Sequence, residues 1–281
     1  MTHIANRAIS GKRRLLLGAS VVAASLWLTL AGCDSGEEDA AFSQGYAAYQ
    51  QGDFAAALAI WKPLADKGDA RALYNLGMLY SEGRGVTRDV PLAMQLWRKA
   101  ADQGHMRARH NLALALITGD GNRQDYRAAI EELKITAAAG FANSQYSLGK
   151  MLVDGLGGSK DEAAGMNYIT MAAEQGFAKA QYSLAKAYRD GAGVKKSDEM
   201  AAIWFKKAAE RGHLRAQQHL AFCLAEGKGL PRDEVAALKW ALIAANQGAA
   251  DIAQLAAQLS QNLTAEQVTR AETEAAAFRP E

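Results

Sequence analysis

The chain lacks the residue patterns on which most catalytic and cofactor sites depend. Its 281 residues contain no G-x-S-x-G elbow, no phosphate-binding glycine loop, no H-E-x-x-H and no C-x-x-C pair. Among the five histidines, His105 and His213 follow glycines at turn positions, and none of the five has the spacing of a metal-ligand set. We therefore predict that the protein is not an enzyme and that it binds no metal and no cofactor.

Acidic residues are absent from the first 32 positions. Four basic residues between Arg7 and Arg14 precede an apolar run over 15–31, which is the layout of a signal peptide. The run leads into L-A-G-C at Cys33, which looks like a bacterial lipobox, so we expect Cys33 to be lipidated and to become the N-terminus. The alternative is an uncleaved anchor helix with an incidental cysteine, although a run of about seventeen apolar residues is marginal for a membrane span.

Neither sign of charge is in excess. The chain has 32 Lys and Arg against 30 Asp and Glu. Four of the basic residues lie in the signal segment, which leaves 28 against 30 and a mature chain close to neutral. We therefore predict that nucleic acid is not a partner. Cysteine is scarce too: if Cys33 carries lipid, Cys223 is a lone thiol in the apolar run A-F-C-L, where a buried cysteine behaves as a small hydrophobe.

A short acidic segment follows Cys33. Residues 34–39, D-S-G-E-E-D, include no hydrophobic side chain, which is typical of a solvated tether. Six extended residues reach only about 20 Å, so the folded part would lie near a membrane surface. We expect a periplasm-facing lipoprotein of the cell envelope. Resemblance to enteric lipoproteins with aspartate directly after the cysteine favours the inner membrane slightly over the outer membrane.

The chain does contain a 36-residue pattern that occurs five times. The copies begin at Ala70, Met106, Ala142, Ala178 and Leu214, and each has leucine at its seventh place and glycine at its fourteenth, sixteenth and thirty-fifth places. Glycine can end a helix in the left-handed conformation, so each copy predicts two helices separated by a G-x-G turn. No copy can bury its apolar stripe alone, and the copies must therefore stack as a solenoid.

This arrangement resembles the Sel1-like repeat family, the 36-residue relative of the tetratricopeptide repeat. The L-G, G-x-G-V and A-A-x-x-G elements occur together and in order, and the resemblance covers roughly residues 41–249. The resemblance implies an all-α fold, namely a right-handed α-solenoid of antiparallel helix pairs. It also implies that the solenoid binds protein partners. The lack of cysteine pairs separates the chain from the cysteine-rich members of the family, so their activities are not implied.

The predicted organisation follows from these segments. The C-terminal segment contains T-A-E-Q from Thr264, a capping box that predicts a helix ending near Pro280. The segments are a lipoprotein signal peptide (1–32), the lipidated cysteine and acidic tether (33–40), a tetratricopeptide-like helix pair (41–69), five repeats over 70–249 (70–105, 106–141, 142–177, 178–213 and 214–249) and C-terminal capping helices (250–281).

The candidate site is the inner face of the solenoid. By analogy with tetratricopeptide repeats, the second, fifth, ninth and twelfth places of each first helix point into a concave groove. The candidate partner-binding residues are Arg71, Tyr74, Met78, Arg107, His110, Tyr146, Lys150, Lys179, Tyr182, Lys186, Arg189, Arg215 and Phe222. Arginine and tyrosine are favoured at protein interfaces, and the basic ladder predicts an acidic protein segment as the ligand. The alternative is that these charges are merely solvated and that the tyrosines only pack.

Three function classes remain open at this point. The first is a membrane-anchored adaptor that holds a partner protein in the groove. The second is an immunity protein, because some Sel1-like lipoproteins neutralise periplasmic phospholipase toxins. The third is a cell-wall hydrolase, by loose analogy with the cysteine-rich relatives, and the missing catalytic residues argue against it. The sequence identifies neither the partner nor the oligomeric state.

Overall fold

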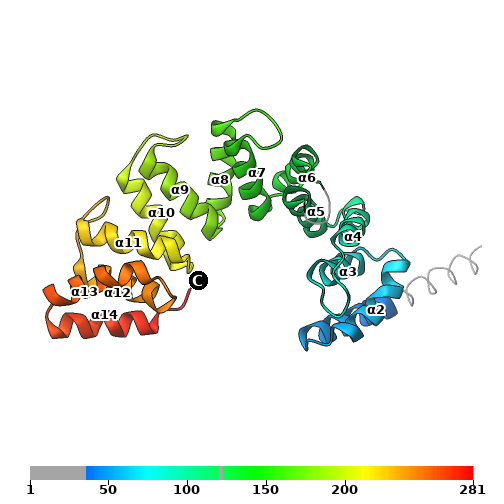
Figure 1. Cartoon of the computed structure of the whole chain (residues 1–281), viewed down its shortest axis with the longest axis horizontal. Helices are drawn as coiled ribbons and strands as arrows, with labels where there is room; N and C mark the ends of the chain where they lie inside the picture. Colours follow the sequence, from blue (N-terminus) through cyan, green and yellow to red (C-terminus); the bar gives the residue numbers. More distant parts are fainter. Residues whose placement is uncertain (1–35, 120–122, 281) are drawn as a thin grey trace, which may run out of the picture. The chain divides into compact units, whose positions relative to one another are not determined.

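The structure of the chain is a computed structural model that describes residues 36–119 and 123–280 (Figure 1). Every regular element in these two ranges is a helix, and the helices pack as antiparallel pairs, so the predicted all-α solenoid is confirmed. The signal peptide and Cys33 lie outside the described residues. The chain forms two compact units, one that ends at Asp89 and one that begins at Val90.

The first unit contains three helices around one tryptophan. They are the helix over 36–50, α2 (Phe54–Asp66) and α3 (Ala70–Glu82). Trp61 is fully buried, and its indole N–H donates to the carbonyl of Phe42 at 3.2 Å. A Cβ atom at Gly45 would lie 2.4 Å from the indole nitrogen, so only glycine lets this helix approach the ring.

Residues 36–40 differ from the acidic tether that their composition predicts. They form the first turns of the helix over 36–50. Glu38 pairs with Lys67 at 2.9 Å, and Asp39 pairs with Arg71 at 2.7 Å. Carboxylates are favourable near a helix N-terminus because of the helix dipole, and the two distant cations add to that effect. The stretch is therefore part of the folded unit.

The second unit continues the repeats as helix pairs. Its elements are α4 (Val90–Asp102), α5 (Met106–Thr118), α6 (Tyr126–Ala138), α7 (Ala142–Asp154), α8 (Glu162–Glu174), α9 (Ala178–Asp190), α10 (Asp198–Glu210), α11 (Leu214–Glu226), α12 (Glu234–Asn246), the short 3₁₀ helix η1 (Ala250–Ile252), α13 (Ala253–Asn262) and α14 (Ala265–Ala277). The first helix of a copy ends as predicted at a glycine in the left-handed conformation, for example Gly191 with φ 74° after α9.

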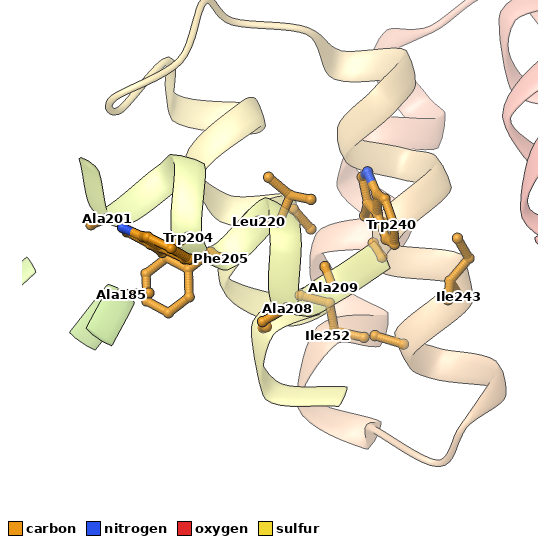
Figure 2. Close-up of a cluster of buried hydrophobic side chains, with 14 of the residues drawn as sticks. Ala185, Ala201, Trp204, Phe205, Ala208, Ala209, Leu220, Trp240, Ile243 and Ile252 are labelled. Atoms are coloured by element: carbon orange, nitrogen blue, oxygen red, sulfur yellow. The ribbon is translucent and has the colours of Figure 1, made fainter. Parts of the chain in front are cut away.

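The repeated leucines and paired alanines form the core of the second unit. Leu112, Leu148, Leu184 and Leu220, at the seventh place of their copies, are all buried. The paired alanines at the ends of the second helices are small enough to let neighbouring helices approach closely. Figure 2 shows one such region, where Trp204, Phe205, Ala208, Ala209, Leu220 and Trp240 pack together.

The C-terminal helices cover the last copy. The predicted capping box at the start of α14 is present, because Thr264 and Gln267 each accept a hydrogen bond from the other's backbone N–H. After α14, Phe278 packs edge-to-face on Trp240 with ring centroids 5.3 Å apart. Across the described ranges, none of the helices is both long enough and apolar enough to cross a membrane.

Candidate functional site

Hydrogen bonds from buried polar side chains hold successive copies in register. Gln145, Gln181 and Gln217 stand at the fourth place of the first helices α7, α9 and α11 and are almost fully buried. Each amide donates to a backbone carbonyl near the end of the preceding second helix, at 3.1–3.3 Å. A buried amide must find such partners to avoid a desolvation penalty, so these bonds fix where each first helix lies.

A second set of contacts joins the first helices to one another. The His110 ring of α5 is hydrogen-bonded to the Ser144 hydroxyl of α7 at 2.8 Å. The Tyr146 hydroxyl of α7 lies 3.3 Å from the Ser183 hydroxyl of α9. The Arg189 guanidinium of α9 lies 3.5 Å from the His219 ring of α11. The four first helices α5, α7, α9 and α11 are therefore neighbours along one face of the second unit (Figure 1).

This face contains a hollow of about 720 Å³. Its walls come from α7, α8, α9, the turn after α9 and the start of α11. Six of the thirteen candidate residues line it, namely Tyr146, Lys150, Lys179, Tyr182, Lys186 and Arg215. The other lining residues are Val153, Glu162, Met166, Ile169, Ser183, Ala187, Asp190, Ala192, Gly193, His213 and Leu214.

Positive charge predominates in the hollow. Four cationic side chains line it, of which Lys150 pairs with Asp154 at 3.2 Å, against the carboxylates of Glu162 and Asp190. Asp190 is occupied by Arg189, whose guanidinium lies 2.7 Å away and lowers the pKa of the carboxyl group. Lys186 lies 5.9 Å from the centre of the Tyr182 ring, which is within cation–π range. The hollow can therefore attract an anionic group and offer it an aromatic surface.

His213 gives the hollow one neutral hydrogen-bond donor. Its Nδ1 accepts the backbone N–H of Ala216 at 3.3 Å and caps α11, which assigns the ring proton to Nε2. The ring stacks on Tyr182 with centroids 4.4 Å apart. Burial lowers the pKa of His213, and the charges of Arg215 and Lys179 lower it further. The imidazole is consequently uncharged at neutral pH.

The structure does not gather the other seven candidates into this hollow. Arg189 and Phe222 line a separate cavity of about 120 Å³ beside Cys223, and burial raises the pKa of that thiol. Arg107 and His110 belong to α5, one copy before the hollow. Arg71, Tyr74 and Met78 belong to α3 in the first unit.

Arg71 has structural partners of its own. Its guanidinium pairs with Asp69 and Asp39, both at 2.7 Å, and lies 4.5 Å from the centre of the Phe42 ring. These contacts fasten the helix over 36–50 to α3. Arg71 therefore anchors a helix, although the sequence groups it with the basic ladder.

Two features of this face were missed by the sequence reasoning. The first is the set of glutamines that join successive copies. Gln145, Gln181 and Gln217 recur at intervals of 36, so the sequence could have identified them. The second is the contribution of α8 to the hollow through Met166 and Ile169. The sequence did not indicate it, because the analogy with tetratricopeptide repeats considered first helices alone. In the described part of the chain, no three His, Cys, Asp or Glu side chains are placed to hold a metal ion.

Comparison with known proteins places the repeats in a family. Residues 70–105, 107–140, 142–177, 178–213 and 214–248 match the Sel1 repeat. No curated protein matches the chain significantly. Among solved structures, a protective antigen of uropathogenic Escherichia coli with an SLR fold is similar, with a TM-score of 0.75 at 28% identity. The likeness covers 88% of this chain and 54% of the antigen, so the chain spans about half of that protein.

Two further structures are similar to smaller degrees. A Sel1 repeat protein from Oxalobacter formigenes has a TM-score of 0.68 at 25% identity, covering 86% of this chain and 97% of that protein. An immunity protein from Pseudomonas aeruginosa has a TM-score of 0.48 at 19% identity, covering 79% of this chain and 82% of that one, a likeness too weak to bear on function. The prediction of five Sel1-like repeats is confirmed, and the chain belongs to the Sel1 repeat family, whose members are protein-interaction scaffolds and in general not catalytic.

Proposed function

We propose that the protein is a non-enzymatic adaptor of the cell envelope, and that it binds an acidic segment of a partner protein in the hollow on α7, α8, α9 and α11. One observation carries this proposal: Lys150, Lys179, Lys186 and Arg215, from three successive copies, converge on one hollow that also contains two tyrosines. The chain as a whole is nearly neutral. The hollow thus has four cations against two carboxylates, whereas the whole chain has almost equal numbers of the two.

The chemistry of the lining supports a protein segment as the ligand. Lys179, Lys186 and Arg215 are exposed. A carboxylate of the partner can therefore reach them directly from solvent. Tyr146 and Tyr182 are half-buried and offer rigid apolar surface at a small entropic cost. Complementary charge increases the association rate and selects against basic partners.

The anchor is a separate part of the proposal. The L-A-G-C stretch before Asp34 supports lipidation of Cys33 and placement of the folded chain on the periplasmic side, and the aspartate after the cysteine favours the inner membrane slightly. Mass spectrometry of the mature N-terminus should find acylated Cys33. An intact Met1 would refute the anchor and leave the binding site untouched.

The binding site is tested by capture in living cells. The tagged full chain is cross-linked to its neighbours, and the captured proteins are compared with those of Lys179→Glu/Arg215→Glu. We expect the double variant to lose an acidic envelope partner at unchanged thermal stability. The matched control is Lys62→Glu/Lys134→Glu, which makes the same charge change at exposed lysines outside the hollow.

The same experiment separates the adaptor from the other function classes. Equal capture by the hollow variant and the control would disprove the site. Capture of a toxin delivered by a rival cell, with no endogenous partner, would change the function to immunity. Hydrolysis of cell-wall fragments by the purified chain would make the protein an enzyme.

A further inference from the structure

We infer that the partner segment has an apolar side chain at each end of its acidic stretch, and that these two side chains dock on Leu114 and Phe222. This inference rests on the proposed function, because it takes the acidic segment in the hollow as given. It adds the length and the pattern of that segment. The two side chains are exposed, share one register in their copies and lie on either side of the hollow's lysines.

Leu114 and Phe222 expose more surface than large apolar residues usually do. Their exposed fractions are 38% and 42%. In the described ranges only Tyr46, Ile135 and Met171 are comparable. Single exposed hydrophobic residues are common on protein surfaces. What distinguishes this pair is its position relative to the hollow.

Both residues stand at the ninth place of a first helix. The same place in the two copies between them holds Lys150 and Lys186, which line the hollow. The ninth places of α5, α7, α9 and α11 therefore read apolar, basic, basic, apolar. The inter-helix contacts of His110, Tyr146 and Arg189 hold these four helices side by side, so Leu114 and Phe222 flank the basic pair.

The separation of the two apolar residues sets the length of the segment. Directly packed helices are about 8–10 Å apart. The successive first helices from α5 to α11 meet only through side chains, so three steps span at least roughly 24–30 Å. An extended chain advances about 3.3 Å per residue, so that distance corresponds to at least about seven to nine residues. An extended segment that crosses the four helices can place one apolar side chain at each end and carboxylates between them.

Phe222 has apolar neighbours on one side. The small cavity that it lines contains Phe205, Ala201 and the half-buried thiol of Cys223, beside the charged side chains of Arg189, Asp198, Glu226 and Lys228. A partner side chain laid on Phe222 would remove both apolar surfaces from water, and one laid on the exposed side chain of Leu114 would do so there. Burial of one such group is worth about 1.5 kcal/mol or more, which corresponds to roughly a tenfold gain in affinity at each end.

Synthetic peptides test the pattern. Fluorescence anisotropy measures binding of labelled L-D-E-D-E-D-E-D-L, A-D-E-D-E-D-E-D-A and L-D-E-D-L to the full chain in nanodiscs. We expect the long leucine peptide to bind at least about tenfold more tightly than either of the others. Leu114→Ser and Phe222→Ser should each weaken the long leucine peptide roughly tenfold and leave the alanine peptide unchanged.

A matched variant controls for the loss of surface apolarity. Ile135→Ser alters a residue that is 47% exposed on the second helix α6, outside the row, and should leave all three affinities unchanged. Because the three side chains are exposed, their replacement should not alter the melting temperature.

The outcomes separate this inference from the proposal on which it rests. Equal affinity of the leucine and alanine peptides would overturn the apolar docking and support an acidic ligand. No binding by any peptide would overturn both. Self-association of the chain that Phe222→Ser abolishes would assign the apolar row to a second copy and overturn the inference as well.

Discussion

The second copy and the three copies after it join to their predecessors with different chemistry. In the last three copies a buried neutral amide, from Gln145, Gln181 or Gln217, donates to the carbonyl of the preceding helix. In the second copy the same place is Arg109, whose guanidinium donates to the carbonyl of Ala101 at 2.6 Å. We call this hydrogen bond the joint between two copies. The fourth-place side chain donates to the same kind of carbonyl in all four copies, but it is charged only in the second copy.

The charged joint changes the core of its own copy. A guanidinium stays protonated, so it needs an anion nearby. Arg109 finds Glu132 at 2.6 Å, and the side chains of the pair are only 16% and 22% exposed. Glu132 takes the twenty-seventh place of its copy, where the later copies have Tyr168, Trp204 and Trp240. Joint and second helix are therefore linked within a copy: the arginine joint pairs with a carboxylate at the place where the copies with a glutamine joint have an aromatic residue.

The largest effect should be the same on both sides of this comparison. Leu112 and Leu184 are equally buried in the second and fourth copies, so Leu112→Ala and Leu184→Ala should each lower the free energy of unfolding by about 2–5 kcal/mol through cavity formation. Urea unfolding followed by circular dichroism measures both. If only one of them costs stability, the cores are not equivalent and the comparison no longer isolates the joints.

An exchange of joints should have an intermediate effect. Arg109→Gln leaves the mostly buried Glu132 carboxylate without its cation and should cost about 1–3 kcal/mol. Adding Glu132→Tyr makes the second copy like the third, so the double variant should recover most of that loss. The same urea experiment gives the coupling free energy. If the double variant is as unstable as the sum of the two single variants, joint and core are independent.

The smallest effect should be that of pH. The glutamine joints do not titrate, whereas His213, which caps α11 beside one of them, does. Burial lowers the pKa of folded His213 below its ordinary value of 6.5. The unfolded chain therefore binds the proton more readily. The contribution of His213 to stability is complete above about pH 6.5 and is lost as the pH falls through the lowered pKa.

His213→Asn tests this effect, because asparagine caps a helix without titrating in this range. Between pH 7 and pH 5 the melting temperature should fall less for the variant than for the parent chain. The corresponding difference in the free energy of unfolding should be about 1 kcal/mol or less. Some loss should remain, because burial also lowers the pKa of His110 and of His219. An unchanged pH dependence would show that the cap contributes nothing.

Periodicity predicted the parts of the fold that depend on local pattern. The five repeats, the buried leucines and the Thr264 capping box follow from spacing and short-range chemistry, and all three are confirmed. Residues 36–40 are instead helical, and two of their carboxylates pair with Lys67 and Arg71, about 30 residues away. Composition does not show such long-range contacts, so the prediction of a solvated tether is wrong for residues 36–40.

The candidate site was predictable to a smaller extent. The basic and aromatic places of the first helices could be identified from the period together with the analogy to tetratricopeptide repeats, and six of those residues share the hollow. Its other wall depends on how closely α8 lies to α9, which a repeat period does not specify. Whether the hollow binds a partner stays a prediction until capture is measured.

The glutamine joint also bears on how such a chain can change in length. The buried glutamine of each of the last three copies donates to a main-chain carbonyl of its predecessor, a group that every residue carries. In the third and fifth copies its amide oxygen accepts a hydrogen bond from the same copy, from Gln175 to Gln145 at 2.7 Å and from Gln247 to Gln217 at 2.9 Å. Even Arg109 is neutralised by a residue of its own copy. A duplication or deletion of one whole copy therefore preserves this backbone joint, whereas side-chain contacts such as that of His110 with Ser144 change at the new junction. Natural variation in the length of this chain should consequently proceed in steps of 36 residues.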